Sequence, residues 1–164
     1  MTHPMFQRIA SFYLPAVERL EHWTRPIFLL IVRVVWGFQF AQRGWGKLNN
    51  HAAVAQWFGE DLGIPFPELN AWMAGGTEFF GGILLLLGLG GRVVAIPLAY
   101  TMCVAYATSD LEAVQGVTLT DWDSFLEAAP FLFLFAALIV LVFGSGPLSV
   151  DGLIHRTWKK ANPS

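Results

Sequence analysis

Charge and cysteine are both scarce in this sequence. Charged residues make up 13% of the 164 residues, against about 25% in an average soluble domain. Ten basic and twelve acidic residues leave a net charge of −2, so the chain has no positive excess to attract a phosphate backbone. The single cysteine, Cys103, permits neither an internal disulfide nor a CxxC site. A nucleic-acid-binding domain and a dithiol oxidoreductase are therefore excluded.

Motifs for common cofactors are also missing. The four histidines lie outside the long apolar segments, so we expect no bis-histidine haem. Metal-ligand spacings, a phosphate-binding loop and a dinucleotide-binding glycine pattern are absent, and we expect no metal site. Only one acidic residue, Glu78, falls well inside an apolar segment. A proton pump or an aqueous pore, which needs a path of polar groups, is therefore poorly supported.

Apolar residues, in contrast, are abundant. The hydrophobic fraction is 55%, with seven Trp and fourteen Phe, and the mean hydropathy is +0.52. A soluble domain of this size cannot bury so much apolar surface. A bilayer core takes about 20 apolar residues in a helix. Four segments meet this length, at residues 26–45, 69–89, 92–108 and 126–143. The sequence therefore predicts an all-α fold, an integral membrane four-helix bundle over residues 25–153.

The two ends of the chain differ from this central part. Residues 1–24 carry charges and no signal-peptide core. Their apolar side chains recur at helical spacing, at Phe6, Ile9, Tyr13, Ala16, Val17 and Leu20. This pattern favours an amphipathic helix at the membrane interface, and an unstructured tail is the alternative. Residues 154–164 form a basic tail.

The basic residues predict the orientation. Seven of them flank one side of the predicted spans: Arg8, Arg19, Arg25, Arg92, Arg156, Lys159 and Lys160. The other side has only Arg43 and Lys47, and residues 109–125 contain acidic residues but no basic ones. Basic residues concentrate on the cytoplasmic side, so both termini are predicted to be cytoplasmic. Within the outward loop, residues 50–58 are predicted to form a short helix capped by Asn50.

Two opposite charges fall inside the predicted spans. Each of Arg33 and Glu78 would cost at least about 2.5–3.5 kcal/mol if left alone in the membrane. At about 1.5 Å per residue, Arg33 lies about 10 Å, and Glu78 about 15 Å, from the predicted cytoplasmic span ends. We therefore predict an Arg33–Glu78 ion pair between neighbouring helices. Such a pair either only holds the bundle together or forms part of a functional pocket.

Helical phase places more cations beside this pair. One face of the first span is predicted to point inward, with Arg33, Trp36, Gly37, Phe40, Arg43, Gly44 and Lys47. The facing side of the second span is small, with Ala71, Ala74, Gly75, Glu78, Gly81 and Gly82. Glu78 can neutralise only one of the three cations. The remainder would suit an anionic or carbonyl-bearing ligand, although Arg43 and Lys47 could instead extend to the outer interface.

The order of several short motifs resembles one membrane family. The motifs are Arg33 with Gly37, Arg43-Gly44-Trp45-Gly46-Lys47-Leu48, Glu78-Phe79-Phe80-Gly81-Gly82-Ile83, Gly88-Leu89-Gly90-Gly91-Arg92, and Phe143-Gly144-Ser145-Gly146-Pro147-Leu148-Ser149-Val150-Asp151. Over residues 25–153 the chain resembles the DoxX family of small four-helix bacterial membrane proteins. The resemblance implies a place in the cytoplasmic (inner) membrane. It also implies a link to quinone-coupled redox chemistry, since one branch is similar to a subunit of thiosulfate:quinone oxidoreductase.

A quinone subunit is the first functional hypothesis. A quinone head needs donors for two carbonyl oxygens and an aromatic surface. Arg33 or Arg43 could donate, Trp36 and Phe40 could stack, and Lys47 and Tyr100 complete the candidate ligand-binding set. Arg33 and Glu78 are the catalytic candidates. Pairing with Arg33 would oppose the raised pKa that a proton relay through Glu78 requires.

Other functions stay open. With no redox centre beyond Cys103 and its aromatic residues, the chain would receive electrons from redox subunits of a membrane assembly or directly from the substrate. The alternatives are a non-catalytic membrane adaptor, and a transporter of a small solute or lipid. A homo-oligomer is compatible with each of these hypotheses.

Overall fold

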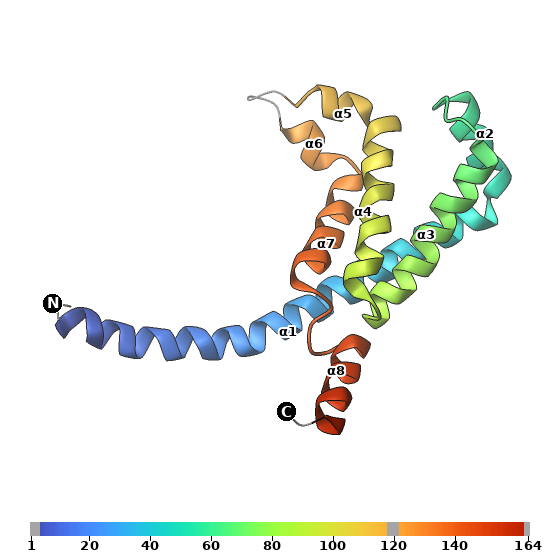
Figure 1. Cartoon of the computed structure of the whole chain (residues 1–164). Coiled ribbons are helices and arrows are strands. Elements are labelled where there is room, and N and C mark those ends of the chain that lie inside the picture. The colour runs from blue at the N-terminus through green and yellow to red at the C-terminus, as the bar shows by residue number, and fades with distance from the viewer. Residues whose placement is uncertain (1–3, 118–121, 163–164) are drawn as a thin grey trace.

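The computed structural model describes residues 4–117 and 122–162, and within these ranges every regular element is a helix. The all-α prediction is confirmed. Figure 1 shows how the helices are arranged. They are α1 (Pro4–Asn49), α2 (His51–Glu60), α3 (Pro67–Leu87), α4 (Gly91–Thr108), α5 (Leu111–Gln115), α6 (Asp123–Glu127), α7 (Pro130–Phe143) and α8 (Val150–Ala161).

Helix α1 is longer than the sequence predicts. It runs without a break through Pro26, where the first span was expected to begin, and its N-terminal part extends away from the other helices (Figure 1). At about 1.5 Å per residue, its 46 residues span about 70 Å, more than twice the roughly 30 Å of a bilayer core. Only part of α1 can therefore lie in a membrane core. The predicted apolar stripe before residue 24 rests partly on Phe6, Ile9 and Ala16, whose side chains lie outside the described residues.

The other long helices follow the predicted spans closely, with one difference. Helices α3 and α4 match residues 69–89 and 92–108 within two residues at each end. The fourth predicted span is divided into α6 and α7, because Ala128 is extended (φ −59°, ψ 139°) and Pro130 occupies the first turn of α7. Proline suits that position because the first turn needs no backbone donor.

Glycines bring α1 and α3 into backbone contact. A Cβ on Gly82 would lie 2.4 Å from the Ala41 nitrogen and 2.7 Å from the Gly37 carbonyl oxygen. A Cβ on Gly44 would lie 2.2 Å from the Phe79 nitrogen and 2.7 Å from the Gly75 carbonyl oxygen. Small residues permit this approach. The predicted small face of the second span is confirmed at five of its six positions, since Ala71, Gly75, Glu78, Gly81 and Gly82 are all buried. The sixth, Ala74, is half-buried.

The four long helices contact one another in sequence. Helix α1 packs on α3, α3 on α4, α4 on α7, and α7 on α1. Figure 1 shows the α1–α3 and α4–α7 pairs close together at their lower ends and diverging at their upper ends. The core between them contains Phe40, Leu85, Leu98, Phe133 and Val140. In this arrangement the C-terminal part of α1, which is its upper part in Figure 1, faces the beginning of α7.

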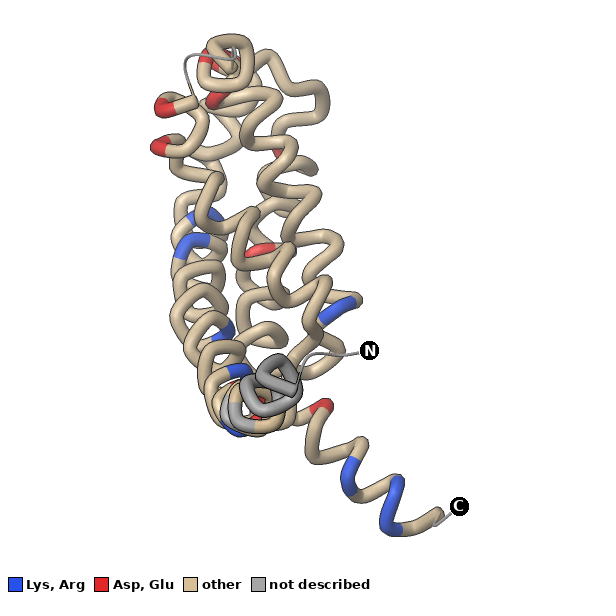
Figure 2. The backbone as a smooth tube through the Cα atoms, turned by 90° about the vertical axis from the view of Figure 1, so that its left-hand side faces the viewer, with Lys and Arg blue, Asp and Glu red and all other residues tan. Residues whose placement is uncertain are grey.

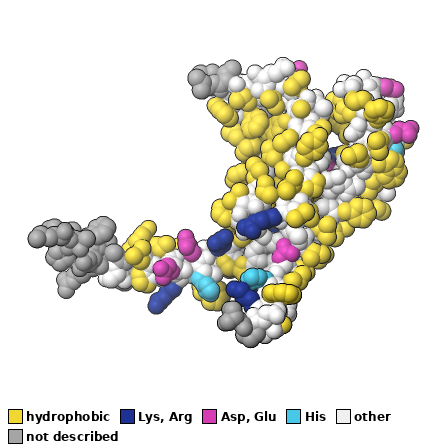
Figure 3. Space-filling model, viewed as in Figure 1, with side chains coloured by type: hydrophobic (Ala, Val, Ile, Leu, Met, Phe, Trp, Pro, Cys, Tyr) yellow, Lys and Arg dark blue, Asp and Glu magenta, His cyan; other side chains and the backbone are white. Residues whose placement is uncertain are grey.

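The outer surface of these helices is apolar. Large exposed hydrophobic residues include Ile31 and Phe38 on α1, Phe80 on α3, Val93 on α4 and Val142 on α7, and Figure 3 shows this apolar surface. Among the described residues, Tyr13–Asn49 and Gly91–Thr108 are long and apolar enough to cross a membrane, and Pro130–Phe143 is a shorter apolar helix. Exposed apolar surface of this extent indicates an apolar environment.

The predicted short helix after the first span is α2. Asn50 occupies its N-cap position, but its side chain forms no cap hydrogen bond and instead donates to the Gly46 carbonyl oxygen at 3.0 Å. The chain then turns into α3 through Phe66, which has a positive φ of 51°, with Pro67 as the first residue of α3. The helix prediction is confirmed, and the predicted capping bond is wrong.

Candidate functional site

Glu78 pairs with Lys47, and the predicted Arg33–Glu78 ion pair was wrong. Lys47 Nζ donates to Glu78 Oε1 at 2.5 Å. The Glu78 side chain is 1% exposed and that of Lys47 is 28% exposed. The second carboxylate oxygen, Oε2, is buried and has no hydrogen-bond partner among the described residues. The pair therefore neutralises the charge of Glu78 but satisfies only one of its oxygens.

The register of α1 against α3 explains the error. Gly44 faces Gly75 and Phe79, whereas Arg33 lies beside Gly88, at the end of α3. Arg33 and the part of α1 that faces Glu78 are thus about ten residues apart, or about 15 Å along the helix. The predicted depths were counted from a span end at Pro26, but α1 has no end there.

Arg33 instead connects α1 to the segment that precedes α8. Arg33 is 1% exposed, and its guanidinium donates through Nη2 to the Leu148 carbonyl oxygen. A Cβ on Gly88 would lie 1.9 Å from Arg33 Nη1 and 2.6 Å from Ser149 Cβ. Gly88 also has a positive φ of 68°, which glycine adopts without strain. The guanidinium therefore fits only because residue 88 lacks a side chain.

Asp151 completes this connection at the start of α4. Its carboxylate accepts hydrogen bonds from the Gly90 nitrogen (2.8 Å), the Gly91 nitrogen (3.1 Å) and Ser145 Oγ (2.8 Å). Burial alone would raise the pKa of Asp151. The hydrogen bonds from Gly90, Ser145 and Gly91 and the nearby Arg33 charge outweigh burial, so the pKa is lowered. The ionised carboxylate therefore stabilises this junction.

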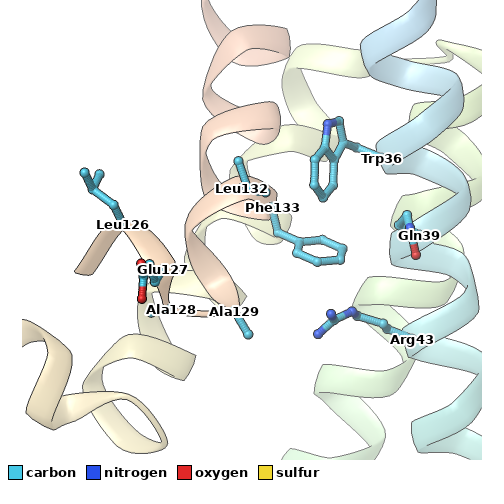
Figure 4. Close-up of a pocket in the computed structure, with 9 residues that line it drawn as sticks. All are labelled: Trp36, Gln39, Arg43, Leu126, Glu127, Ala128, Ala129, Leu132 and Phe133. Atoms are coloured by element: carbon cyan, nitrogen blue, oxygen red, sulfur yellow. The ribbon is translucent and has the colours of Figure 1, made fainter. Parts of the chain in front are cut away.

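A separate cavity of about 270 Å³ lies between α1 and the α6–α7 junction. Figure 4 shows Arg43, from α1, pointing toward the beginning of α7. The lining residues are Trp36, Gln39, Arg43, Leu126, Glu127, Ala128, Ala129, Leu132 and Phe133. Its volume is close to the lower limit, about 300 Å³, of typical small-molecule pockets. A flat ring or a small head group is the size of ligand that it can hold.

Arg43 and Trp36, both on α1, contact the Phe133 ring of α7 at this cavity. The guanidinium carbon of Arg43 lies 4.4 Å from the centre of the Phe133 ring, within the range of a cation–π contact. Trp36 meets the same ring edge-on, at 5.0 Å and 74°. Arg43 has no carboxylate partner among the ion pairs of the described residues. A cation–π contact uses no hydrogen-bond donor, so the N–H groups of Arg43 can still donate to a ligand.

The predicted ligand-binding residues are thus divided among four places. Trp36 and Arg43 line the cavity, and Lys47 pairs with Glu78. Phe40 is fully buried in the core against Phe133. Tyr100 is 70% exposed on α4 and does not line the cavity. The structure does not bring Arg33, Glu78 or Tyr100 to the cavity.

Sequence reasoning missed seven of the nine lining residues, and three of these have polar or aromatic side chains. Gln39 lies one helical turn before Arg43 on α1, and this spacing is visible in the sequence. Glu127 and Phe133 come from either side of the α6–α7 break. Pro130 marks that break, but nothing in the sequence pairs it with α1.

Comparison with known proteins identifies the family. The DoxX family profile matches residues 28–110, just over half of the chain. The chain belongs to the DoxX family. The matched part of this DoxX protein includes the α1 side of the cavity and the Lys47–Glu78 pair. The α6–α7 side lies outside it.

Three other proteins are similar to this chain along much of their length. A Bacillus subtilis protein named "Putative oxidoreductase CatD" is 28% identical over 82% of this chain and 92% of its own length. An uncharacterized protein of Haemophilus influenzae is 29% identical over 80% of this chain and 86% of its own. An uncharacterized membrane protein of Mycobacterium tuberculosis is 33% identical over 62% of each chain. No solved structure matches this chain.

Proposed function

We propose that this membrane protein of the DoxX family binds a quinone head group in the cavity between α1 and the α6–α7 junction. In this proposal it is one subunit of a quinone-linked membrane oxidoreductase. The observation that carries the proposal is the position of Arg43, which lies over the Phe133 ring at the cavity with no acidic partner among the described ion pairs. The oxidoreductase name of the Bacillus subtilis relative supports the redox part.

The chemistry of the lining suits a quinone. Quinone carbonyl oxygens accept hydrogen bonds, which the Arg43 guanidinium and the Gln39 amide are able to donate. The ring is flat and apolar, and the half-buried Trp36 offers aromatic surface beside those donors. A cation also stabilises the negative charge that develops on a quinone oxygen during reduction. Electrons come from a neighbouring subunit or directly from a substrate.

We place the four long helices across the bacterial cytoplasmic membrane as a bundle, with both termini in the cytoplasm. Their apolar outer faces support a membrane environment. Arg25 lies over Phe143 and Arg92 donates to the Val142 carbonyl oxygen, so both basic residues mark one end of α7. Figure 2 shows acidic residues gathered at the opposite, upper end. This asymmetry favours a cytoplasmic location for the basic end.

Arg33 and Glu78 have positioning roles in this proposal, because neither lines the cavity. Arg33 holds the segment before α8 against α1, through the Leu148 carbonyl oxygen. Glu78 and Lys47 connect α3 to the part of α1 that also carries Arg43, one turn away. Substitutions at Arg33 or Glu78 are therefore expected to change stability before they change quinone affinity.

Titration of the purified protein with a short-chain quinone, followed by tryptophan fluorescence, tests the proposal. We expect saturable quenching that weakens at least tenfold in Arg43→Gln, since a charged hydrogen bond contributes about 1.5–3 kcal/mol. Arg92→Gln is the matched control, because it removes an arginine away from the cavity, and it should bind as the parent does. Equal affinity in Arg43→Gln, or no saturable quenching in the parent, would refute the proposal. The second result would favour a non-catalytic adaptor.

A further inference from the structure

Helix α8 is amphipathic. At 100° per residue, Val150, Leu153, Ile154, Thr157, Trp158 and Ala161 share one side of the helix. His155, Arg156, Lys159 and Lys160 share the other. The single acidic residue, Asp151, is engaged by the start of α4. Beyond Asp151, α8 therefore has an apolar stripe on one side and basic or neutral polar residues, with no acidic residue, on the other.

The apolar stripe has no cover within the described chain. Leu153 is 59% exposed, Ile154 53% and Trp158 68%, and no residue of α8 is buried. Exposed apolar side chains in a row are costly in water. Something outside the described residues is therefore needed to cover this stripe.

The start of α8 is held firmly at the basic end of the molecule. Ser149 caps the helix by accepting from the Gly152 nitrogen at 3.0 Å. Asp151 binds the first turn of α4, and the buried Arg33 holds the Leu148 carbonyl oxygen. Figure 1 shows α8 leaving the lower end of the helices, close to where α7 ends. That is the end where Arg25 and Arg92 lie against α7.

We propose that α8 is a lipid-binding helix that docks its apolar stripe on an anionic membrane surface. Arg156, Lys159 and Lys160 supply the charge complementary to acidic head groups. Each basic residue near such a surface strengthens binding about fivefold. Trp158 is the aromatic type enriched at the membrane–water interface. A purely apolar protein groove would cover the stripe but would not account for three flanking cations, so the charge favours lipid over a protein partner.

Site-specific labelling of the whole protein tests this inference. In a Cys103→Ser background, one variant carries Ile154→Cys on the apolar stripe and a matched control carries Lys159→Cys on the opposite side. Each is labelled with a polarity-sensitive fluorophore and placed in nanodiscs of phosphatidylcholine alone or mixed equally with phosphatidylglycerol. Brominated acyl chains report contact with lipid, and iodide reports exposure to water.

In anionic nanodiscs we expect the label at position 154 to be quenched by brominated chains and protected from iodide. The label at position 159 should behave in the opposite way. Replacing Arg156, Lys159 and Lys160 with Gln in the Ile154→Cys variant should lower the ratio of docked to free α8 by about a hundredfold. All three side chains are exposed, so the unfolding temperature should not change.

Three results would overturn the inference. The first is equal exposure of both labels to iodide in anionic nanodiscs. The second is equal protection at position 154 in neutral and anionic nanodiscs, since the charges would then have no role. The third is protection that appears only when other membrane proteins are added, which would make the stripe a protein-docking surface.

Discussion

Replacing Gly82 with alanine perturbs a backbone contact between α1 and α3. The added Cβ would lie 2.4 Å from the Ala41 nitrogen and 2.7 Å from the Gly37 carbonyl oxygen. Non-bonded heavy atoms prefer about 3.5–4.0 Å. Because both obstructing atoms belong to the backbone, no side-chain rotation relieves the clash. The two helices must therefore separate by about 1 Å.

The change in the free energy of unfolding caused by Gly82→Ala is the sum of two opposing contributions, packing and helix propensity. Forcing extra volume into a packed interface costs about 1–3 kcal/mol. Replacing glycine by alanine in a helix returns up to about 1 kcal/mol of intrinsic propensity. At Gly82 the packing term exceeds the propensity term. At Gly76, where a Cβ would have nothing within 4 Å, only the propensity term applies.

Unfolding in detergent micelles, followed by circular dichroism, measures the difference. Gly82→Ala should unfold at a clearly lower temperature or denaturant concentration than the parent, and Gly76→Ala at an equal or higher one. The two substitutions are chemically identical and lie on the same helix, so they differ only in what surrounds the new methyl group. If both variants unfold at the same temperature or denaturant concentration, the close packing of α1 on α3 does not contribute to stability and the reasoning fails.

Two further predictions concern the charged side chains that connect the helices. A double-mutant cycle on unfolding should give a coupling energy of about 1 kcal/mol or more between Lys47→Met and Glu78→Gln, because breaking a buried pair leaves one charge uncompensated. The coupling energy between Arg33→Met and Glu78→Gln should be near zero. If Glu78 instead couples to Arg33 and not to Lys47, the rejected Arg33–Glu78 pairing is correct. The lowered pKa of Asp151 means that its contribution to stability is complete above the unfolded-state value of about 3.9 and is lost as pH falls through the folded-state value. Melting temperatures from pH 6 to 3 should therefore fall more steeply in the parent than in Asp151→Asn, and parallel curves would contradict this assignment.

Helix boundaries were predictable where local chemistry decides them. Gly88 and Gly90 both have a positive φ, 68° and 61°, so the turn between α3 and α4 is encoded by residues that tolerate it. The inward face of the second span was also predictable, because its small residues recur at helical spacing. These features depend on neighbours in the sequence.

The pairing of charges was not predictable, because it depends on the register between helices. The sequence shows three cations on one face of α1 and one carboxylate on α3, but not where the helices touch. The contacts of Gly37 and Gly44 set that register, and they place Lys47 rather than Arg33 at Glu78. The second side of the cavity was hidden for the same reason, since Glu127 and Phe133 reach α1 only through tertiary packing.

Photolabelling with an azido-quinone tests the central claim most directly. The purified protein is irradiated with the labelled quinone, with and without excess unlabelled quinone, and modified peptides are identified by mass spectrometry. We predict competable labelling within residues 36–43 of α1 and residues 126–133 at the α6–α7 junction. Labelling that is not competed, or that falls mainly on α2 or on the outer face of α4 around Tyr100, would contradict a quinone site in this cavity.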